Sequence, residues 1–302
     1  MAGLLLLLGG GELLVGGARD LARHWGASPL LIGLTVVAFG TSLPELFVAL
    51  AASWRGVPEI MLGNVIGSNI ANIGLILAIS LLVSPLSLRF RSVATEMALL
   101  HLATAGLFAL TLLGYFPAVA GWLSVALLII YTFVVYRRSA VANAAAATAP
   151  EPLPVAGIGK SLLLVAFGLV ALAGGSEMFL RGAVEISRAL GVSELVIGLT
   201  LAAIGTSLPE LATCFAALRQ RQDALLVGNI IGSNLFNLLM VLGVTGVVLP
   251  FALPASLLRR DLPVMAAFSL VLLLLISWRG RLGRLLGAGL LAAYGGYLYL
   301  LV

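Results

Sequence analysis

Residues 40–45 read GTSLPE, and residues 205–210 read GTSLPE again. Each copy lies between two apolar runs, so a glycine, a proline and a glutamate stand in the middle of a hydrophobic segment. Proline lacks an amide hydrogen and clashes with a continuing helix, while glycine relaxes the backbone beside it. The repeated hexapeptide therefore predicts a helix that breaks and resumes, once in each half of the chain.

The composition of the 302-residue chain is that of an integral membrane protein. Hydrophobic residues make up 61% of it, charged residues make up 10%, and the mean hydropathy is +1.16. Apolar runs of about 20 residues, the length that spans a bilayer as a helix, recur from end to end, which leaves no room for a soluble enzyme module. The single cysteine excludes an intrachain disulfide. The expected membrane segments are 2–21, 28–53, 58–84, 94–114, 117–136, 160–181, 190–218, 223–249, 262–278 and 284–302.

An internal duplication relates the two halves of the chain at an offset of 165 residues. Between 28–73 and 193–238, 23 of 46 aligned positions are identical, which is beyond the chance similarity of apolar helices. The stretch 137–159, rich in Ala, Pro and Thr, suits a flexible linker. We therefore divide the chain into a first five-helix repeat (1–136), this linker, and a second five-helix repeat (160–302).

Five segments per repeat mean that the second repeat enters the membrane from the opposite side. Cytoplasmic loops carry an excess of Lys and Arg. With the N-terminus outside, twelve of the seventeen basic residues lie in inner loops and five in outer loops. We expect a multi-pass protein of the cell membrane with an outside N-terminus and a cytoplasmic linker. The basic residues separate hydrophobic segments instead of forming one face, which argues against nucleic-acid binding.

Glu45 and Glu210 are the charged groups of the two hexapeptides. A capping box, in which Ser42 and Glu45 cap the helix that Pro44 begins, would also place a glutamate here. However, a charged side chain at membrane depth costs at least about 2.5–3.5 kcal/mol on insertion scales, and a serine or threonine alone could cap a helix. We therefore favour a cation held between the two glutamates, near the midplane where inverted repeats meet.

The third and eighth segments carry a second repeated motif, GNVIGSNIAN at 63–72 and GNIIGSNLFN at 228–237. Its glycines have the GxxxG spacing of closely packed membrane helices, and its polar side chains could form packing hydrogen bonds. In each copy the serine and the last asparagine are four residues apart, so they share one helical face. Hydroxyl, amide and carboxylate oxygens, without sulfur or imidazole, suit a hard cation such as calcium or sodium. The side chains concerned are Ser68, Asn72, Ser233 and Asn237.

The paired GTSLPE and GNxIGSN segments resemble the two alpha-repeats of sodium/calcium exchangers, within the calcium/cation antiporter superfamily. The resemblance covers essentially the whole chain. It implies an all-α membrane protein of ten helices in two inverted five-helix repeats, with helices 2, 3, 7 and 8 broken around one calcium site flanked by sodium sites. The ligand positions that it implies are Glu45, Glu210, Thr41, Thr206, Ser42, Ser207, Ser68, Ser233, Asn72 and Asn237, with the backbone carbonyls of Ala38 and Ala203.

The resemblance also implies a secondary antiporter that exchanges sodium for calcium by alternating access. No enzymatic step and no cofactor are expected, and the transported calcium and sodium ions and the lipid bilayer are the partners of a single functional chain. Some relatives carry an aspartate where this chain has Asn237, and its absence argues against potassium co-transport. One calcium ion neutralises the two remaining carboxylates, whereas three sodium ions would overshoot, which leaves the stoichiometry open.

Three alternatives are a proton-coupled calcium or other divalent-cation antiporter, a passive cation channel, and an intramembrane enzyme with paired carboxylates. The calcium/proton branch typically has a GNxxE-like motif where this chain has GTSLPE, which favours sodium, although the glutamate pair could still couple to protons. Ten spans in one inverted-repeat chain favour a carrier over a channel. An intramembrane enzyme would need a nucleophile or a water path to a peptide substrate.

Two further glutamates, Glu12 and Glu177, occupy equivalent positions in the first and sixth segments. We expect them to pack at an interface or to line an ion path. In the family that the sequence resembles, these two helices slide across the rest of the protein, and the glycines around both glutamates could ease such a movement.

Overall fold

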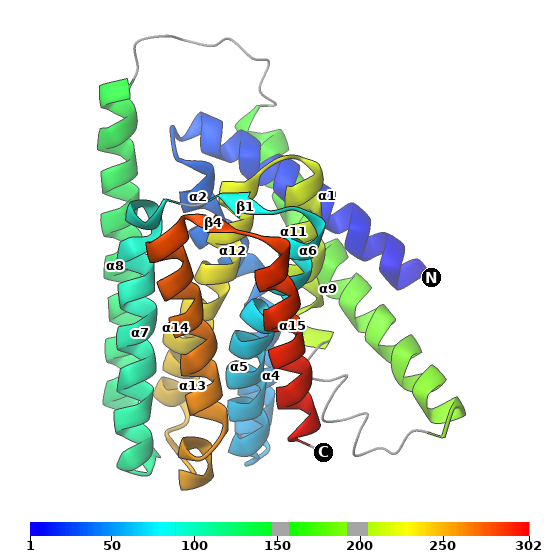
Figure 1. Cartoon of the computed structure of the whole chain (residues 1–302), viewed down its shortest axis with the longest axis vertical. Helices are drawn as coiled ribbons and strands as arrows, with labels where there is room; N and C mark the ends of the chain where they lie inside the picture. Colours follow the sequence, from blue (N-terminus) through cyan, green and yellow to red (C-terminus); the bar gives the residue numbers. More distant parts are fainter. Residues whose placement is uncertain (88, 147–156, 192–204, 302) are drawn as a thin grey trace.

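The computed structural model describes residues 1–87, 89–146, 157–191 and 205–301, and nearly all of this chain is helical (Figure 1). The α-helices are α1 (Ala2–His24), α2 (Pro29–Ile32), α3 (Ala38–Thr41), α4 (Leu43–Trp54), α5 (Pro58–Ala71), α6 (Ala78–Val83), α7 (Phe90–Leu112), α8 (Ala118–Ala146), α9 (Ile158–Ala189), α11 (Leu208–Arg219), α12 (Asp223–Phe236), α13 (Leu242–Val248), α14 (Asp261–Arg279) and α15 (Arg284–Tyr299). The other helical segments are the π-helical η1 (Gly33–Val37), η2 (Asn72–Leu77) and η3 (Asn237–Val241) and the 3-10 helix η4 (Ala255–Leu258).

Many of these helices are long and apolar enough to cross a membrane, as the composition predicts. Among the described residues seven qualify, or eight if the bent pair Pro29–Thr41 and Leu43–Trp54 counts as one span. The chain is therefore an all-helical, multi-pass membrane protein. The expected segment 190–218 lies partly outside the described residues, and α15 has only 16 residues, so the count of ten stays a prediction.

Burial separates central helices from peripheral ones. The apolar window of the span Asp223–Val248 is 100% buried and that of Pro58–Val83 is 78% buried, whereas that of Ala118–Arg137 on α8 is only 17% buried. The two copies of the GNxIGSN motif thus lie on the most enclosed helices. Polar side chains on a wholly buried helix must find their partners inside the protein, so the centre of the bundle is where a polar site can form.

The helix break predicted at GTSLPE is present in the first half. α3 ends at Thr41, α4 begins at Leu43, and the two directions differ by 40°. The capping box is not formed, because Ser42 makes no side-chain cap and neither carboxylate oxygen of Glu45 has a hydrogen-bond partner in the described structure. Ser207 occupies the same place before α11 and likewise makes no cap. The capping box therefore does not explain why the two hexapeptides carry a glutamate.

The helix breaks expected in the third and eighth segments are wrong, because both helices continue without a break. The helix Pro58–Val83 runs on through η2, and Asp223–Val248 runs on through η3, as π-helical turns. A π-helical turn carries i→i+5 hydrogen bonds and accommodates extra residues without ending the helix. Both turns begin at the asparagine that closes the GNxIGSN motif, Asn72 or Asn237.

Glycines allow the first repeat to approach the second. A Cβ added at Gly33 of η1 would collide with the carbonyl oxygen of Leu225, and one added at Gly228 would collide with that of Leu30. The backbones of α2–η1 and α12 therefore touch directly, as the GxxxG spacing predicts. This contact sets the first GTSLPE segment beside the second GNxIGSN helix.

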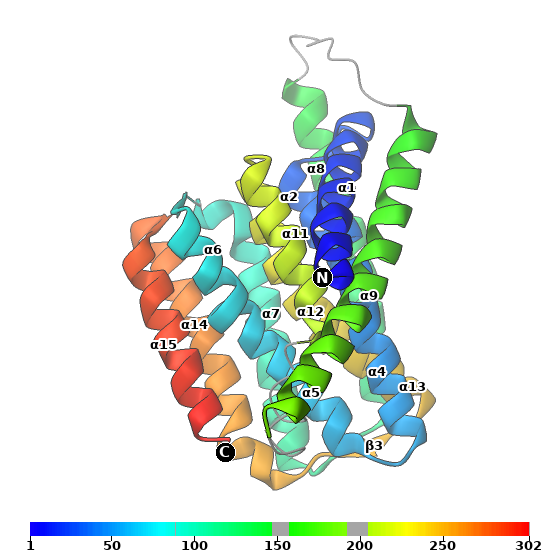
Figure 2. The same ribbon diagram turned by 90° about the vertical axis from the view of Figure 1, so that its right-hand side faces the viewer.

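Two short antiparallel strand pairs join the halves at opposite ends of the molecule (Figures 1 and 2). β1 (Leu86–Ser87) pairs with β4 (Arg281–Leu282), and β2 (Tyr115–Phe116) pairs with β3 (Phe251–Ala252). Each pair takes one strand from each half. At the offset of 165 residues, β1 corresponds to β3 and Phe116 of β2 corresponds to Arg281 of β4, so the pairs are counterparts of each other.

α1 and α9 lie side by side, inclined against the upright helices of the bundle (Figures 1 and 2). α8 extends to Ala146, ten residues past the expected end of the first repeat. The intervening stretch 147–156 is outside the described residues.

Candidate ion-binding site

The polar residues of both GTSLPE segments are buried in the centre of the bundle. Glu45 and Glu210 each expose only 1% of their surface. The Ser233 hydroxyl lies 3.4 Å from both Oε1 of Glu210 and the hydroxyl of Thr41, which belongs to the same hexapeptide as Glu45, so both glutamates lie in one buried polar cluster. Two like charges in one desolvated site repel each other unless a cation or a proton compensates them. The geometry thus brings together one carboxylate from each half of the chain.

The predicted serines and asparagines of α5, η2, α12 and η3 complete the enclosure. The four side chains are each no more than 1% exposed: Ser68, Asn72, Ser233 and Asn237. The Ser233 hydroxyl donates a hydrogen bond of 3.4 Å to Oε1 of Glu210. The second GNxIGSN motif is therefore in direct contact with the second glutamate.

Hydrogen bonds across the halves connect the first hexapeptide to α12. The Thr41 hydroxyl donates to Oδ1 of Asn229 at 3.3 Å and lies 3.4 Å from the Ser233 hydroxyl. It also lies 3.1 Å from the carbonyl oxygen of Val37 and 3.4 Å from that of Ala38. The side chain of Thr41 is thus held between its own helix and the opposite repeat.

The second hexapeptide makes the counterpart contacts with α5. The Thr206 hydroxyl donates to Oδ1 of Asn64 at 3.1 Å and lies 3.5 Å from the Ser68 hydroxyl. The Ser207 hydroxyl donates to that of Ser68 at 3.3 Å. Asn64 also donates to the backbone oxygen of Glu45 at 3.2 Å. Each repeat therefore holds the threonine of the other.

Several oxygens of the site have no hydrogen-bond partner within the described part of the chain. A buried polar atom without a partner costs about 1–3 kcal/mol, and native interiors contain few of them. Their concentration around two carboxylates matches the donor set of a hard cation, which binds carboxylate, amide and hydroxyl oxygens. The oxygens are Glu45 Oε1 and Oε2, Glu210 Oε2, Ser42 Oγ, Asn72 Oδ1 and Asn237 Oδ1.

Of the two backbone carbonyls expected among the ligands, the structure describes one. Ala38 is fully buried, one helical turn before Ser42. Ala203 lies outside the described residues. Among those that are described, no three His, Cys, Asp or Glu side chains cluster, so neutral oxygens would supply most of the ligands to any ion held here.

Sequence reasoning missed four asparagines around the site, of which three bond through their side chains and Asn69 through its backbone oxygen. Asn64 and Asn229 contact the threonines as described above. Asn72 donates to Oδ1 of Asn234 at 2.9 Å, and Asn234 donates to the backbone oxygen of Asn69 at 3.5 Å. All four were visible as repeated letters in the two GNxIGSN motifs, because Asn64 and Asn69 lie 165 residues before Asn229 and Asn234.

A cavity of about 480 Å³ leads to the site between α9 and the hexapeptide segments. Its lining includes Thr41, Thr206 and Glu177, and Glu177 forms an exposed ion pair of 2.6 Å with Arg181. Glu177 thus lines a cavity that reaches two of the predicted ligand residues, and its role in an ion path stays a prediction.

The counterpart of Glu177 is engaged differently. Glu12 on α1 lies 3.3 Å from the guanidinium of Arg219 and accepts a hydrogen bond of 2.8 Å from Gln220, at the end of α11. This contact joins α1 to α11, which is the packing role expected for Glu12. The two halves, though related in sequence, are therefore not in the same conformation.

The fold and the candidate site together define a multi-pass membrane protein whose core presents two carboxylates and many neutral oxygens, a donor set suited to a hard cation. The chain belongs to the sodium/calcium exchanger protein family, whose model matches residues 1–140 and 160–302. The resemblance stated from the two repeated motifs is confirmed.

Individual relatives support the same assignment. The chain is 38% identical to CaxA of Alkalimonas amylolytica, which is named as a candidate antiporter, over 100% of this chain and 97% of that one. It is 32% identical to the sodium/calcium exchanger MaX1 of Methanosarcina acetivorans, over 100% and 97% of the two chains. A solved structure of the sodium-calcium exchanger NCX_Mj superposes with a TM-score of 0.84 at 33% identity, covering 100% of this chain and 97% of that one.

Proposed function

We propose that the protein is a secondary antiporter that exchanges sodium for calcium across the membrane by alternating access. The observation that carries the proposal is the burial of Glu45 and Glu210, one from each half of the chain, in a single polar cluster that hydrogen bonds of Ser233 and Asn64 join. Transport by such a site requires neither an enzymatic step nor a cofactor. The names of the relatives MaX1 and NCX_Mj, both sodium/calcium exchangers, support the same pair of ions.

In this proposal the two carboxylates bind calcium and sodium in competition. Their combined charge of minus two is neutralised by one calcium ion. The remaining ligands set the size and coordination of the site, and the unpartnered oxygens of Ser42, Asn72 and Asn237 support their assignment. The proposed ligands are Thr41, Ser42, Glu45, Ser68, Asn72, Thr206, Ser207, Glu210, Ser233 and Asn237, with the carbonyls of Ala38 and Ala203.

Asn237 sets a limit on the ion stoichiometry. It supplies a neutral amide, so three sodium ions held at once would leave the site with an excess positive charge. We propose that the protein does not transport potassium and that full simultaneous occupancy by three sodium ions is disfavoured.

We further propose ten transmembrane helices in two inverted repeats, 1–136 and 160–302, with the linker 137–159 between them. The two strand pairs support this arrangement, because they are counterparts in sequence and lie at opposite ends of the molecule. The reciprocal contacts of Thr41 with α12 and of Thr206 with α5 support it as well. Each repeat would adopt in turn the conformation of the other.

The proposed orientation places the N-terminus outside the cell and the linker in the cytoplasm. The distribution of basic residues supports it. In this orientation the cavity beside Glu177 opens to the outside, while the contact of Glu12 with Arg219 and Gln220 closes the inner side. The described conformation would then be the outward-facing state of a single functional chain.

Reconstituted vesicles test the proposal. Vesicles loaded with sodium and diluted into sodium-free buffer should take up radiolabelled calcium, and collapse of the sodium gradient should stop the uptake. A proton gradient without sodium should drive none. Uptake that is driven by protons and indifferent to sodium would show a proton-coupled antiporter instead, and uptake without any counter-ion gradient would show a channel.

A further inference from the structure

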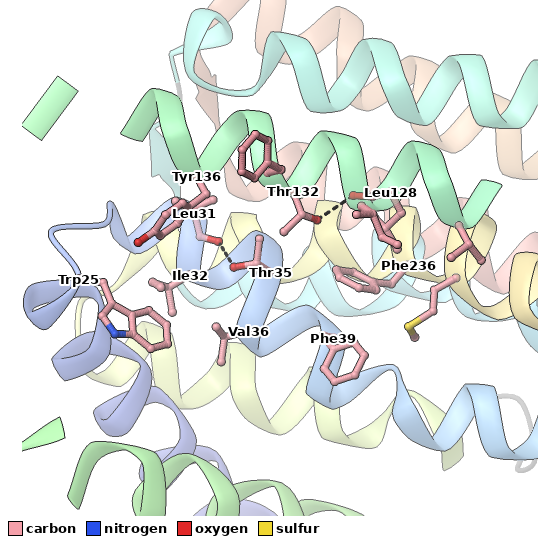
Figure 3. Close-up of a pocket in the computed structure, with 14 residues that line it drawn as sticks. Trp25, Leu31, Ile32, Thr35, Val36, Phe39, Leu128, Thr132, Tyr136 and Phe236 are labelled. Carbon is pink, nitrogen blue, oxygen red and sulfur yellow. Dashed lines mark hydrogen bonds between the residues drawn. The ribbon is translucent and has the colours of Figure 1, made fainter. Parts of the chain in front are cut away.

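An apolar groove of about 730 Å³ lies between α8 and the first half of the broken helix, away from the carboxylates (Figure 3). Its lining includes Trp25, Val36, Phe39, Ile129, Tyr136 and Phe236. Several of these side chains are exposed, among them Ile129 at 63% and Phe39 at 46%. Since α8 crosses the membrane at the edge of the bundle, the groove faces lipid.

The two threonine hydroxyls in the wall of the groove are already engaged. The Thr35 hydroxyl donates to the carbonyl oxygen of Leu31 at 2.7 Å, and the Thr132 hydroxyl donates to that of Leu128 at 2.8 Å (Figure 3). Both bonds stay within one helix, so neither hydroxyl needs a partner from a ligand. The wall therefore offers an apolar surface, which a hydrocarbon chain matches and a polar solute does not.

One end of the groove has the side chains typical of a membrane interface. Trp25 and Tyr136 both lie at this end (Figure 3), and such aromatic residues are enriched at the level of the lipid headgroups. The hydrophobic span of α8 ends at Arg137, whose guanidinium lies 5.6 Å from the ring centre of Phe133. Arg23 is exposed in the last turn of α1. Exposed arginines at this level attract anionic headgroups.

The length of the groove fits one leaflet. From Val125 to Tyr136 it follows twelve residues of α8, and the eleven rises between them span about 16 Å at 1.5 Å per residue. Half of a hydrocarbon core is about 15 Å. An acyl chain that begins at the headgroup level beside Tyr136 would thus fill the groove to about the bilayer midplane.

We propose that this groove is the binding site of one anionic glycerophospholipid from the leaflet at the C-terminal ends of α1 and α8. One acyl chain lies along α8, and the phosphate lies near Arg137 and Arg23. Phe39 and Phe236 form the floor beneath the chain, with ring centres 5.8 Å apart and edge to face. Because Asn237 follows Phe236 directly, the bound chain contacts a helix that carries the ion site.

A pair of matched variants on α8 tests the groove. Ile129→Trp fills it, whereas Ile130→Trp adds the same side chain at a neighbouring position that is similarly exposed, at 59%, and does not line the groove. Native mass spectrometry on protein from mixed micelles of phosphatidylglycerol and phosphatidylcholine should show one retained phospholipid per chain. We expect Ile129→Trp to lose it and Ile130→Trp to keep it. Equal retention in both variants, or none in the unaltered protein, would mean ordinary boundary lipid and overturn the proposal.

The headgroup assignment has its own test. Arg137→Gln should reduce the preference for phosphatidylglycerol over phosphatidylcholine about fivefold, the effect of one basic residue near the surface. Arg259→Gln, which removes an exposed arginine outside the groove, should leave the preference unchanged. If both arginine variants alter the preference for phosphatidylglycerol equally, or neither does, the anionic site is refuted. This comparison tests the proposal even if Ile129→Trp fails to fold.

Discussion

Replacement of Asn64 by alanine should weaken calcium binding more than replacement of its counterpart Asn229. Asn64 accepts a hydrogen bond of 3.1 Å from Thr206 and donates one of 3.2 Å to the backbone of Glu45. It therefore positions one residue of each hexapeptide. Interhelical hydrogen bonds in membranes contribute about 0.6 kcal/mol each on average and about 1.7 kcal/mol at most.

Asn229 has one contact of comparable strength. It accepts a hydrogen bond of 3.3 Å from Thr41, but within the described residues its amide donates only to the sulfur of Cys214, at 3.7 Å. If these bonds serve to hold the binding geometry, Asn64→Ala loses about 1.2 kcal/mol and Asn229→Ala about 0.6 kcal/mol. At 1.4 kcal/mol per tenfold change, these losses raise the half-saturating calcium concentration about sevenfold and about threefold.

The assay is the calcium dependence of sodium-driven uptake into vesicles that contain equal amounts of each protein. Thr104→Val is the matched control, because its buried hydroxyl donates at 2.8 Å to the carbonyl oxygen of Leu100 on α7, away from the site. Its half-saturating concentration should not change. The reasoning is refuted if Asn229→Ala is the more damaging variant, or if neither asparagine variant differs from this control.

Two further predictions concern stability. Gly228→Ala sets a methyl group against the carbonyl oxygen of Leu30, and this overpacking should lower the free energy of unfolding by about 1–3 kcal/mol. Gly106→Ala is the control, because an added Cβ there meets nothing within 4 Å, and it should not lower the thermal unfolding temperature in detergent. Equal unfolding temperatures of the two variants would contradict the close contact between α2–η1 and α12. Tyr131→Phe removes a hydrogen bond of 3.0 Å to the buried carboxyl of Glu96, so it should lower the free energy of unfolding by about 1–3 kcal/mol. The half-saturating calcium concentration should stay unchanged.

The donor residues could be predicted from the sequence because they repeat. The spacing of 165 residues identified Glu45 with Glu210 and Ser68 with Ser233, and the cost of charge in a membrane predicted that the glutamates have a function. The break at Ser42 followed from the chemistry of proline and glycine. These inferences rest on local rules, and the structure places the described residues among them in one buried polar cluster.

The crossed contacts could not be predicted in the same way. The duplication relates Thr41 to Thr206, but it does not show that each threonine meets the asparagine of the opposite repeat. That pairing depends on how closely α12 approaches η1, which is set by glycine contacts over a long sequence separation. Likewise, the resemblance to sodium/calcium exchangers implied breaks in the third and eighth segments, but whether a helix breaks or forms a π-helical turn depends on the neighbours that enclose it.

The central claim is that the two halves form one shared site, and the variants Glu45→Gln and Glu210→Gln test it most directly. Each removes one charge with little change in shape. If both carboxylates hold the same ion, each single variant should lose nearly all sodium-driven calcium uptake, and the double variant should lose no more, because residues of one unit are not additive. Retention of about half the uptake by each single variant, with the rest lost only in the double variant, would show two independent sites and contradict the account.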